Sequence, residues 1–348
     1  MAINQSREER EQRVLSAFAQ ARQDGLRFRA EGLGHRRRQD RDPSPTLTYD
    51  MRDWDQVVSY QPQDLVATVG AGLPLSHLNR LLSEHRQWIP LRVADGQDDT
   101  VGGAVAAGVD GILRGGYGSF RDRILGLQVL TPGFGSIRVG SQVVKSVAGY
   151  NLPRLFIGTR GALGVITEVT LKISPKPRVS HCWIWRGPLQ ELLGHAREAE
   201  SLAAPWATLA FIRDWDQGLA LRAEWHGRQQ TVDYLVERLG PGQADAPLEE
   251  LASVGEQVVL KGALPRRELG SLLESWGDGF LVAEWQSGGF FGITSARNQA
   301  EALIAWIRAR SGGVEVLSGP NVGPDHAVPL PEVWRRLKES YDPDGILG

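Results

Sequence analysis

Apolar residues in the first half of the chain follow helical spacing in some segments and form short strand-like runs in others. Near the N-terminus, apolar residues recur at helical spacing and predict an amphipathic helix; they are Val14, Leu15, Phe18 and Ala21. Segment 73–87 repeats leucines at the same spacing, with Pro74 near its start, and predicts a second helix. The strand-like runs lie at residues 26–32, 46–51, 57–62, 64–72, 88–91 and 124–130.

The pattern changes after SPKPR at 174–178, whose prolines and cations predict a linker between domains. Beyond it, strand-like runs alternate with helical stretches at 231–239 and 299–310, which predicts an antiparallel sheet with helices on one face. The fold class expected for the whole chain is α+β. We expect a first domain at 1–177, a smaller α+β domain at 178–330, and a C-terminal helix and turn at 331–348.

Tryptophan is concentrated in the second half of the chain, where nine of the eleven lie. Because tryptophan is enriched at protein interfaces, several of them could face a partner. The candidates are Trp183, Trp185, Trp206, Trp225 and Trp285. Packing between a sheet and its helices is the favoured interpretation for any single one.

Composition excludes several classes of function. A net charge of −2 over 348 residues provides no basic field for nucleic acid. The single cysteine, Cys182, excludes intramolecular disulfides and cysteine-rich metal sites, so any iron–sulfur cluster would belong to a partner chain. The charged N-terminus does not resemble a signal peptide, and no apolar run is long enough for a membrane span. A cytoplasmic protein is therefore expected.

Glycine is unusually dense between Gly102 and Gly164. In the run TVGGAVAAG, Ala104, Ala106, Ala107 and Gly108 could form a helix whose first amides, near Val101–Gly103, face a phosphate. The alternative is a helix of small residues packed tightly on a sheet. The further loops GGYGS and GALGVIT favour the phosphate interpretation. No complete G-x-G-x-x-G or Walker A motif is present, so a dinucleotide would need a different fold.

Four ordered motifs between residues 60 and 177 resemble the FAD-binding domain of the vanillyl-alcohol oxidase/PCMH flavoprotein superfamily. They are YQPQDLVATVGAG, TVGGAVAAG, GGYGSFRDRILGLQVL and VKSVAGYNLPRLFIGTRGALGVITEV. Within the superfamily, the chain is most similar to the family of E subunits of bacterial glycolate oxidases. The resemblance implies FAD held non-covalently between two α+β subdomains.

The matching positions define the candidate FAD site that the resemblance implies. The first loop keeps Gly32 and Gly34, followed by His35 and by arginines at 36–38 that either balance diphosphate charge or form a solvated turn. Arg160 departs from the family pattern. The remaining positions would contact the pyrophosphate (Thr100, Val101, Gly102, Gly103), the flavin side (Gly116, Tyr117, Gly118, Ser119, Asp122) and the adenine half (Gly161, Gly164, Val165, Ile166).

Catalytic residues are not evident in the sequence. The histidine signature H-x-x-D-G-N-x-H of catalytic relatives is absent, and His326 is a lone candidate base for which an exposed loop position is favoured. No histidine pair has metal-ligand spacing, and Cys182 is interpreted as packing. No metal site is expected.

Three functions remain open. The favoured one is the FAD-binding subunit of a glycolate or D-lactate-type 2-hydroxy acid oxidase or dehydrogenase complex. The resemblance implies two partners, a catalytic flavoprotein D-like subunit and an iron–sulfur F-like subunit, and attachment to the inner membrane only through that complex. The alternatives are a structural subunit that has lost FAD and a self-sufficient FAD-dependent 2-hydroxy acid dehydrogenase.

Overall fold

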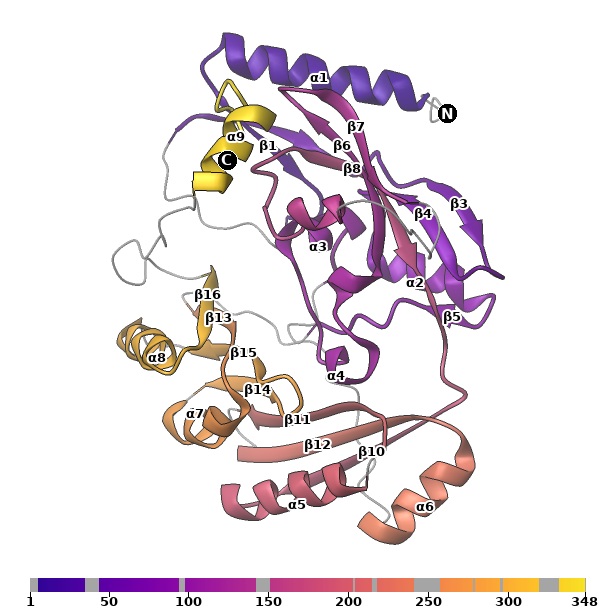
Figure 1. The fold of residues 1–348 in the computed structure, drawn as a ribbon, viewed down its shortest axis with the longest axis vertical. Helices are drawn as coiled ribbons and strands as arrows, with labels where there is room; N and C mark the ends of the chain where they lie inside the picture. The colour runs from indigo at the N-terminus through magenta and orange to yellow at the C-terminus, as the bar shows by residue number, and fades with distance from the viewer. Residues whose placement is uncertain are drawn as a thin grey trace.

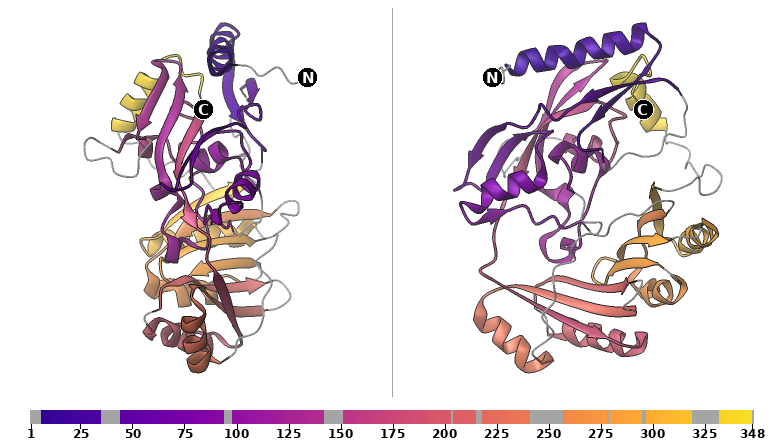
Figure 2. Two further views of the ribbon diagram at one scale, coloured as in Figure 1. Left: turned by 90° about the vertical axis from the view of Figure 1, so that its right-hand side faces the viewer. Right: turned by 180° about the vertical axis from the view of Figure 1, so that it is seen from behind.

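The structure is a computed structural model with two halves, each built around its own antiparallel sheet (Figure 1). The two sheets are stacked along the long axis of the molecule, and the N- and C-termini lie at the same end (Figure 2). The structure describes residues 6–34, 44–93, 98–141, 151–202, 204–214, 218–240, 257–277, 279–294, 297–318 and 332–347.

The first half begins with helix α1 (Arg7–Gln23), as its sequence pattern predicts. The Ser6 hydroxyl accepts a hydrogen bond from the Glu9 backbone N–H, and the Glu9 carboxylate accepts one from the Ser6 backbone N–H. The helix buries Val14, Phe18 and Ala21 and packs on the parallel pair β1 (Arg27–Glu31) and β2 (Thr46–Asp50).

A five-stranded antiparallel sheet forms the centre of this half. The middle strand, β8 (Val165–Lys172), is buried at every position except Lys172, because the sheet is covered on both faces there. In spatial order the strands are β3 (Val57–Gln61), β4 (Val66–Gly70), β8 (Val165–Lys172), β6 (Ile124–Thr131) and β7 (Gly135–Gly140).

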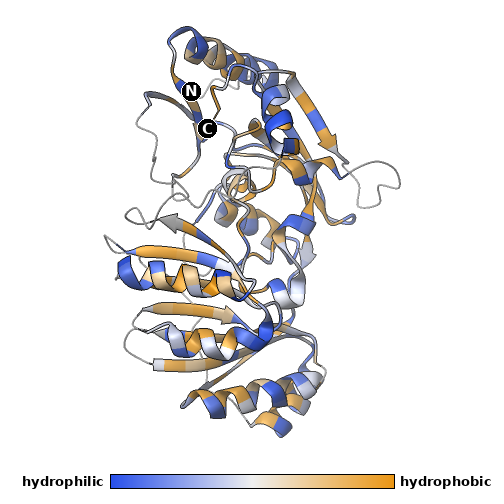
Figure 3. Cartoon of the chain, turned by 60° about the vertical axis from the view of Figure 1, so that its left-hand side comes forward, coloured by the Kyte–Doolittle hydropathy of each residue, from blue (hydrophilic) through white to orange (hydrophobic). Residues whose placement is uncertain are grey.

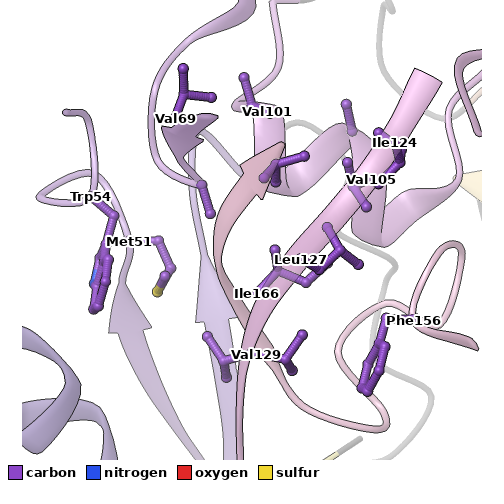
Figure 4. Close-up of a cluster of buried hydrophobic side chains, with 14 of the residues drawn as sticks. Met51, Trp54, Val69, Val101, Val105, Ile124, Leu127, Val129, Phe156 and Ile166 are labelled. Carbon is purple, nitrogen blue, oxygen red and sulfur yellow. The ribbon is translucent and has the colours of Figure 1, made fainter. Parts of the chain in front are cut away.

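Short helices and a strand pair complete the first half. Val101 and Val105 of helix α3 point into the apolar cluster formed with Val69, Leu127 and Ile166 of the sheet (Figure 4). The other elements are α2 (Leu75–Ser83), α3 (Val101–Ala107), α4 (Arg114–Tyr117), the 3₁₀ helices η1 (Phe120–Arg123) and η2 (Leu152–Leu155), and the pair β5 (Gln87–Trp88) with β9 (Ser174–Pro175).

The second half contains a seven-stranded antiparallel sheet. One face packs on four helices, and the other face meets Ile112 and Leu113 of the first half. In spatial order the strands are β10 (Val179–Arg186), β12 (Gly218–Gly227), β11 (Trp206–Asp214), β14 (Phe280–Glu284), β15 (Gly289–Thr294), β13 (Val258–Ala263) and β16 (Gly313–Ser318). The α+β fold class with an antiparallel second sheet is confirmed.

The covering helices show an apolar side toward this sheet and a polar side outward (Figure 3). They are α5 (Leu189–Ser201), α6 (Gln229–Leu239), α7 (Leu269–Ser275) and α8 (Arg297–Ala309), with η3 (Arg266–Glu268) before α7. Trp183, Trp206, Trp225 and Trp285 are buried in this core, as the packing interpretation predicts, and Trp185 is partly buried and stacks on His195.

The end of the chain returns to the first half. Helix α9 (Glu332–Tyr341) lies beside the five-stranded sheet, and Ile346 and Leu347 are buried in its core. The Phe28 N–H donates to the Ile346 carbonyl at 2.7 Å. No helix in the described ranges has both the length and the apolar character that a membrane span requires.

Candidate functional site

A cavity of about 380 Å³, here called the glycine cavity, lies where three loops of the first half meet. The loops are the end of β1 with residues 32–34, the start of α3, and the turn that leads into β8. Nine of the sequence-predicted residues line it, although they come from segments far apart in the chain. They are Gly32, Gly34, Thr100, Gly102, Gly103, Gly161, Gly164, Val165 and Ile166.

Two of these glycines are required by close approach of neighbouring groups. A Cβ on Gly102 would lie 2.5 Å from the Ala71 Cβ and 2.9 Å from the Ala71 carbonyl oxygen. A Cβ on Gly32 would lie 2.5 Å from the Thr100 hydroxyl oxygen. Both contacts are shorter than van der Waals packing allows, so only glycine keeps these loops together around the cavity.

The first amides of α3 are engaged within the protein. The Val101 and Gly102 N–H groups donate to the carbonyls of Leu73 and Ala71, at 2.8 and 2.7 Å, and the Gly103 N–H donates to the Thr100 hydroxyl at 3.0 Å. In this conformation they do not present the free phosphate-facing amides expected from the sequence. The tight packing of a helix of small residues, which the sequence offered as the alternative, is observed: Val101 is fully buried in the core and does not line the cavity.

The turn before β8 is held in place by backbone hydrogen bonds. The N–H groups of Gly158 and Arg160 donate to the carbonyls of Val105 and Ala106 at the end of α3, at 3.1 and 2.8 Å. Gly161 has a φ of +87° and Arg160 a φ of +52°, a left-handed conformation that is uncommon for a residue with a side chain. The Arg160 side chain reaches Glu315 of β16 at 2.8 Å, so it links the two halves.

The predicted flavin-side residues lie outside the lining of this cavity. Gly116 instead approaches the second half, because a Cβ there would lie 2.4 Å from the Trp206 carbonyl oxygen. The Tyr117 hydroxyl hydrogen-bonds to His226 Nδ1 at 2.8 Å. Gly118 caps the end of α4, Ser119 accepts from the Arg121 N–H, and exposed Asp122 pairs with Arg154 at 2.7 Å. The predicted candidates His35, the arginines at 36–38, and His326 lie outside the described residues.

A second cavity of about 90 Å³, here called the junction cavity, lies between loop 107–114 and strands β13–β15. It shares Ala107 and Arg160 with the glycine cavity, so the two are neighbours. Lys261 and Glu284 enter it from the second half. Sequence reasoning missed both residues. For Glu284, the sequence did contain a signal of a functional position: a charged residue ends the otherwise apolar run FLVAE, on the same side of the strand as Phe280 and Val282.

No histidine lines either cavity among the described residues. Within the same part of the chain, no group of three or more histidine, cysteine, aspartate or glutamate side chains is arranged to hold a metal ion.

Comparisons with known proteins identify the family. The family described as "FAD binding domain" matches residues 7–140. The glycolate oxidase subunit GlcE of Escherichia coli is 30% identical over 320 residues, which span 88% of this chain and 87% of the relative. The mitochondrial D-lactate dehydrogenase (cytochrome) of Arabidopsis thaliana is 35% identical over 138 residues, 40% of this chain and 24% of that relative.

A solved structure of alkyldihydroxyacetonephosphate synthase has the same fold. It superposes with a TM-score of 0.71 at 15% identity, over 98% of this chain and 75% of that chain. The chain belongs to the FAD-binding family that contains the glycolate oxidase subunit GlcE. It is an FAD-dependent oxidoreductase subunit, and the predicted cofactor, FAD, is confirmed.

The residues of the glycine cavity fit such a cofactor. The successive N–H groups of Gly32, Leu33 and Gly34 have no acceptor in the part of the chain that the structure describes, and successive amides of this kind form anion-binding concavities. Arg29 and Arg160 are balanced by Glu31 and Asp99 in the lining. A diphosphate would therefore depend on these amides more than on a net positive charge.

Proposed function

We propose that the chain is the FAD-binding subunit of a glycolate or D-lactate-type 2-hydroxy acid oxidase or dehydrogenase complex. The observation that supports the proposal is the glycine cavity, where nine residues that the sequence predicts for FAD binding come together from three separate loops. The similarity to GlcE over most of both chains supports the same assignment.

In this proposal, the backbone amides of Gly32 to Gly34 bind the diphosphate. Thr100, Gly102 and Gly103 form the wall of the cavity beside it. Gly161, Gly164, Val165 and Ile166 shape the wall for the adenine half. The lining contains no histidine, cysteine or tyrosine within the described residues, which supports non-covalent binding. Bound FAD accepts electrons from a substrate or passes them on, and the protein supplies binding, orientation and electrostatics.

The Gly116–Asp122 segment has a different proposed role. It lies beside the second half through Gly116 and Tyr117, so it would position that half relative to the cofactor. In the same proposal, Gly118, Ser119 and Asp122 of this segment contact the flavin side of FAD.

The proposed partners are a catalytic flavoprotein D-like subunit and an iron–sulfur F-like subunit. The proposed division of the chain is an FAD-binding domain at 1–177, a partner domain at 178–330, and a C-terminal helix and turn at 331–348. The proposed location is the cytoplasm, with membrane attachment only through the complex.

The test is the flavin content and FAD affinity of the purified chain. We expect a yellow protein that releases its flavin on denaturation. Gly32→Ala should weaken FAD binding at least tenfold, because the added methyl group collides with Thr100 at the cavity wall. Gly194→Ala is the matched control, because its Cβ would meet nothing within 4 Å on helix α5.

A colourless protein that gains nothing on FAD titration, but still assembles with D-like and F-like subunits, would favour a structural subunit instead. Reduction of a dye by the isolated chain with glycolate would favour the self-sufficient dehydrogenase. Equal FAD affinity in wild type and Gly32→Ala would contradict the placement of the cofactor.

A further inference from the structure

Glu284 is a buried carboxyl group at the junction between the halves. It ends strand β14, whose alternate residues Phe280 and Val282 face the first half. Glu284 therefore faces the same way, and its side chain lines the junction cavity while only 5% exposed.

Both carboxylate oxygens of Glu284 have a hydrogen-bond donor. The Gly115 N–H donates to Oε1 at 2.6 Å, and the Ser287 hydroxyl bonds to Oε2. A Cβ on Gly115 would lie 2.6 Å from Oε1, so glycine at 115 permits this contact. The donors come from both halves and hold the carboxyl group in one orientation.

The protein surroundings favour the protonated form of the Glu284 carboxyl group, compared with the same group in water. Burial raises its pKa above the ordinary value, and the repulsion of Asp110 adds to this. The hydrogen bonds from Ser287 and Gly115 and the charge of Arg114 oppose the shift only in part. Lys261 and Arg160 are the other charged groups of the lining.

The junction cavity has the size for a small acid, and three cationic side chains line it. Its volume is about 90 Å³, and a water needs on the order of 10–15 Å³ of such space, so roughly six to nine water-sized groups fit. The cationic side chains are Arg114, Arg160 and Lys261. Arg160 is paired with Glu315 at 2.8 Å, and the Lys261 ammonium group donates to the Gly108 carbonyl at 2.6 Å. Asp110 is already paired with Arg114 at 2.9 Å, which leaves Glu284 as the carboxyl group suited to exchange a proton.

We propose that Glu284 is a catalytic residue that accepts the hydroxyl proton of a small 2-hydroxy carboxylate bound in the junction cavity. The inference rests on the FAD binding in the proposed function. It places the oxidation of the acid in this chain, while transfer of the electrons to an acceptor stays with the partner subunits. The hydroxyl proton passes to the Glu284 carboxylate as the C–O bond becomes a carbonyl. FAD held by the residues of the glycine cavity would be the oxidant: the Cα hydrogen would leave with its electron pair, the acid would become a 2-oxo acid, and the two electrons would pass to the cofactor.

The first test uses oxalate, a two-carbon dicarboxylate with no Cα hydrogen to lose, and the FAD-loaded chain. Affinity is measured by calorimetry at pH values where oxalate stays fully ionised. In wild type it should fall by up to about tenfold per pH unit above the pKa of Glu284, because the ionised carboxylate repels the ligand. In Glu284→Gln it should not depend on pH. Glu274→Gln, an exposed position on α7, should behave as wild type.

The second test is the rate at which glycolate bleaches the flavin absorbance. Glu284→Gln should lower this rate by about 10²–10⁴-fold while it still binds oxalate. Ser287→Ala removes a donor to the carboxylate, so the pH midpoint of oxalate binding should move upward. This shift distinguishes a proton-exchanging group from a structural contact and does not depend on how well Glu284→Gln folds.

A pH dependence of oxalate binding that survives in Glu284→Gln, or an unchanged bleaching rate, would overturn the inference. A yellow wild-type protein that binds no oxalate, or that glycolate does not bleach, would also overturn it and leave FAD binding intact. A colourless protein would instead overturn the proposed function and this inference together.

Discussion

Arg92 binds Glu224 through both of its terminal nitrogens, at 2.6 Å between Nη1 and Oε2 and 3.2 Å between Nη2 and Oε1. Arg92 follows β5 in the first half, and Glu224 lies on β12 of the second. Arg222 and His226 also bond to this carboxylate, at 3.0 and 2.6 Å. Glu224 therefore joins the two halves, and neither Glu224 nor Arg92 lines one of the two cavities.

Glu224→Gln should destabilise the protein by about 3–5 kcal/mol, because it leaves the buried guanidinium of Arg222 without its carboxylate. The measurement is chemical denaturation followed by tryptophan fluorescence. Glu274→Gln is the matched control and should change the free energy of unfolding by less than about 0.5 kcal/mol. Equal stability of the two variants would show that the Glu224 contacts contribute little.

The contribution of Glu224 should depend on pH. Burial opposes its ionisation, but hydrogen bonds from His226 and Arg92 and the charges of Arg92 and Arg222 outweigh burial and hold the pKa of Glu224 well below 4.5. A lowered pKa in the folded state stabilises the protein above the unfolded value, and that stabilisation is lost as the pH falls through the folded value. The stability difference between wild type and Glu224→Gln should therefore be constant near neutrality and shrink below pH 4.5. A difference that grows on acidification would contradict this assignment.

Gly102→Ala should destabilise the protein by about 1–3 kcal/mol, because the methyl group collides with Ala71 where α3 meets the turn after β4. It should also weaken FAD binding, since Gly102 lines the glycine cavity. Thermal unfolding and FAD titration measure the two effects. Gly194→Ala adds the same methyl group to an open helix position and should be neutral or stabilising by up to about 1 kcal/mol.

Lys338→Met should loosen the C-terminal helix from the cavity wall. The Lys338 ammonium group donates to the carbonyls of Ala162 and Leu347, at 2.8 and 2.6 Å, and to the buried Asp342 carboxylate at 2.7 Å. Its loss should cost about 2–4 kcal/mol, because Asp342 is left buried without its cation. FAD affinity should fall as well, since Ala162 lines the glycine cavity. Arg336→Met removes a more exposed cation of the same helix and should leave FAD affinity unchanged.

The sequence by itself determined the elements and the cofactor loops. Helical spacing at Val14, Phe18 and Ala21 located α1, and the glycine motifs located nine of the residues that line the glycine cavity. These features are local: amphipathic spacing selects a helix, and a tight backbone approach requires glycine wherever it occurs.

Only the tertiary structure decided which of these residues lie together and which residues of the second half they contact. Gly116 and Tyr117 belong to the same motif region as the cavity glycines, yet they contact the second half. Glu284 and Lys261 are unremarkable in sequence, and strand alternation together with the pairing of β13–β15 brings them into one cavity with Arg160. Burial then gives Glu284 its raised pKa. Such properties depend on contacts between residues more than a hundred positions apart, which no local pattern records.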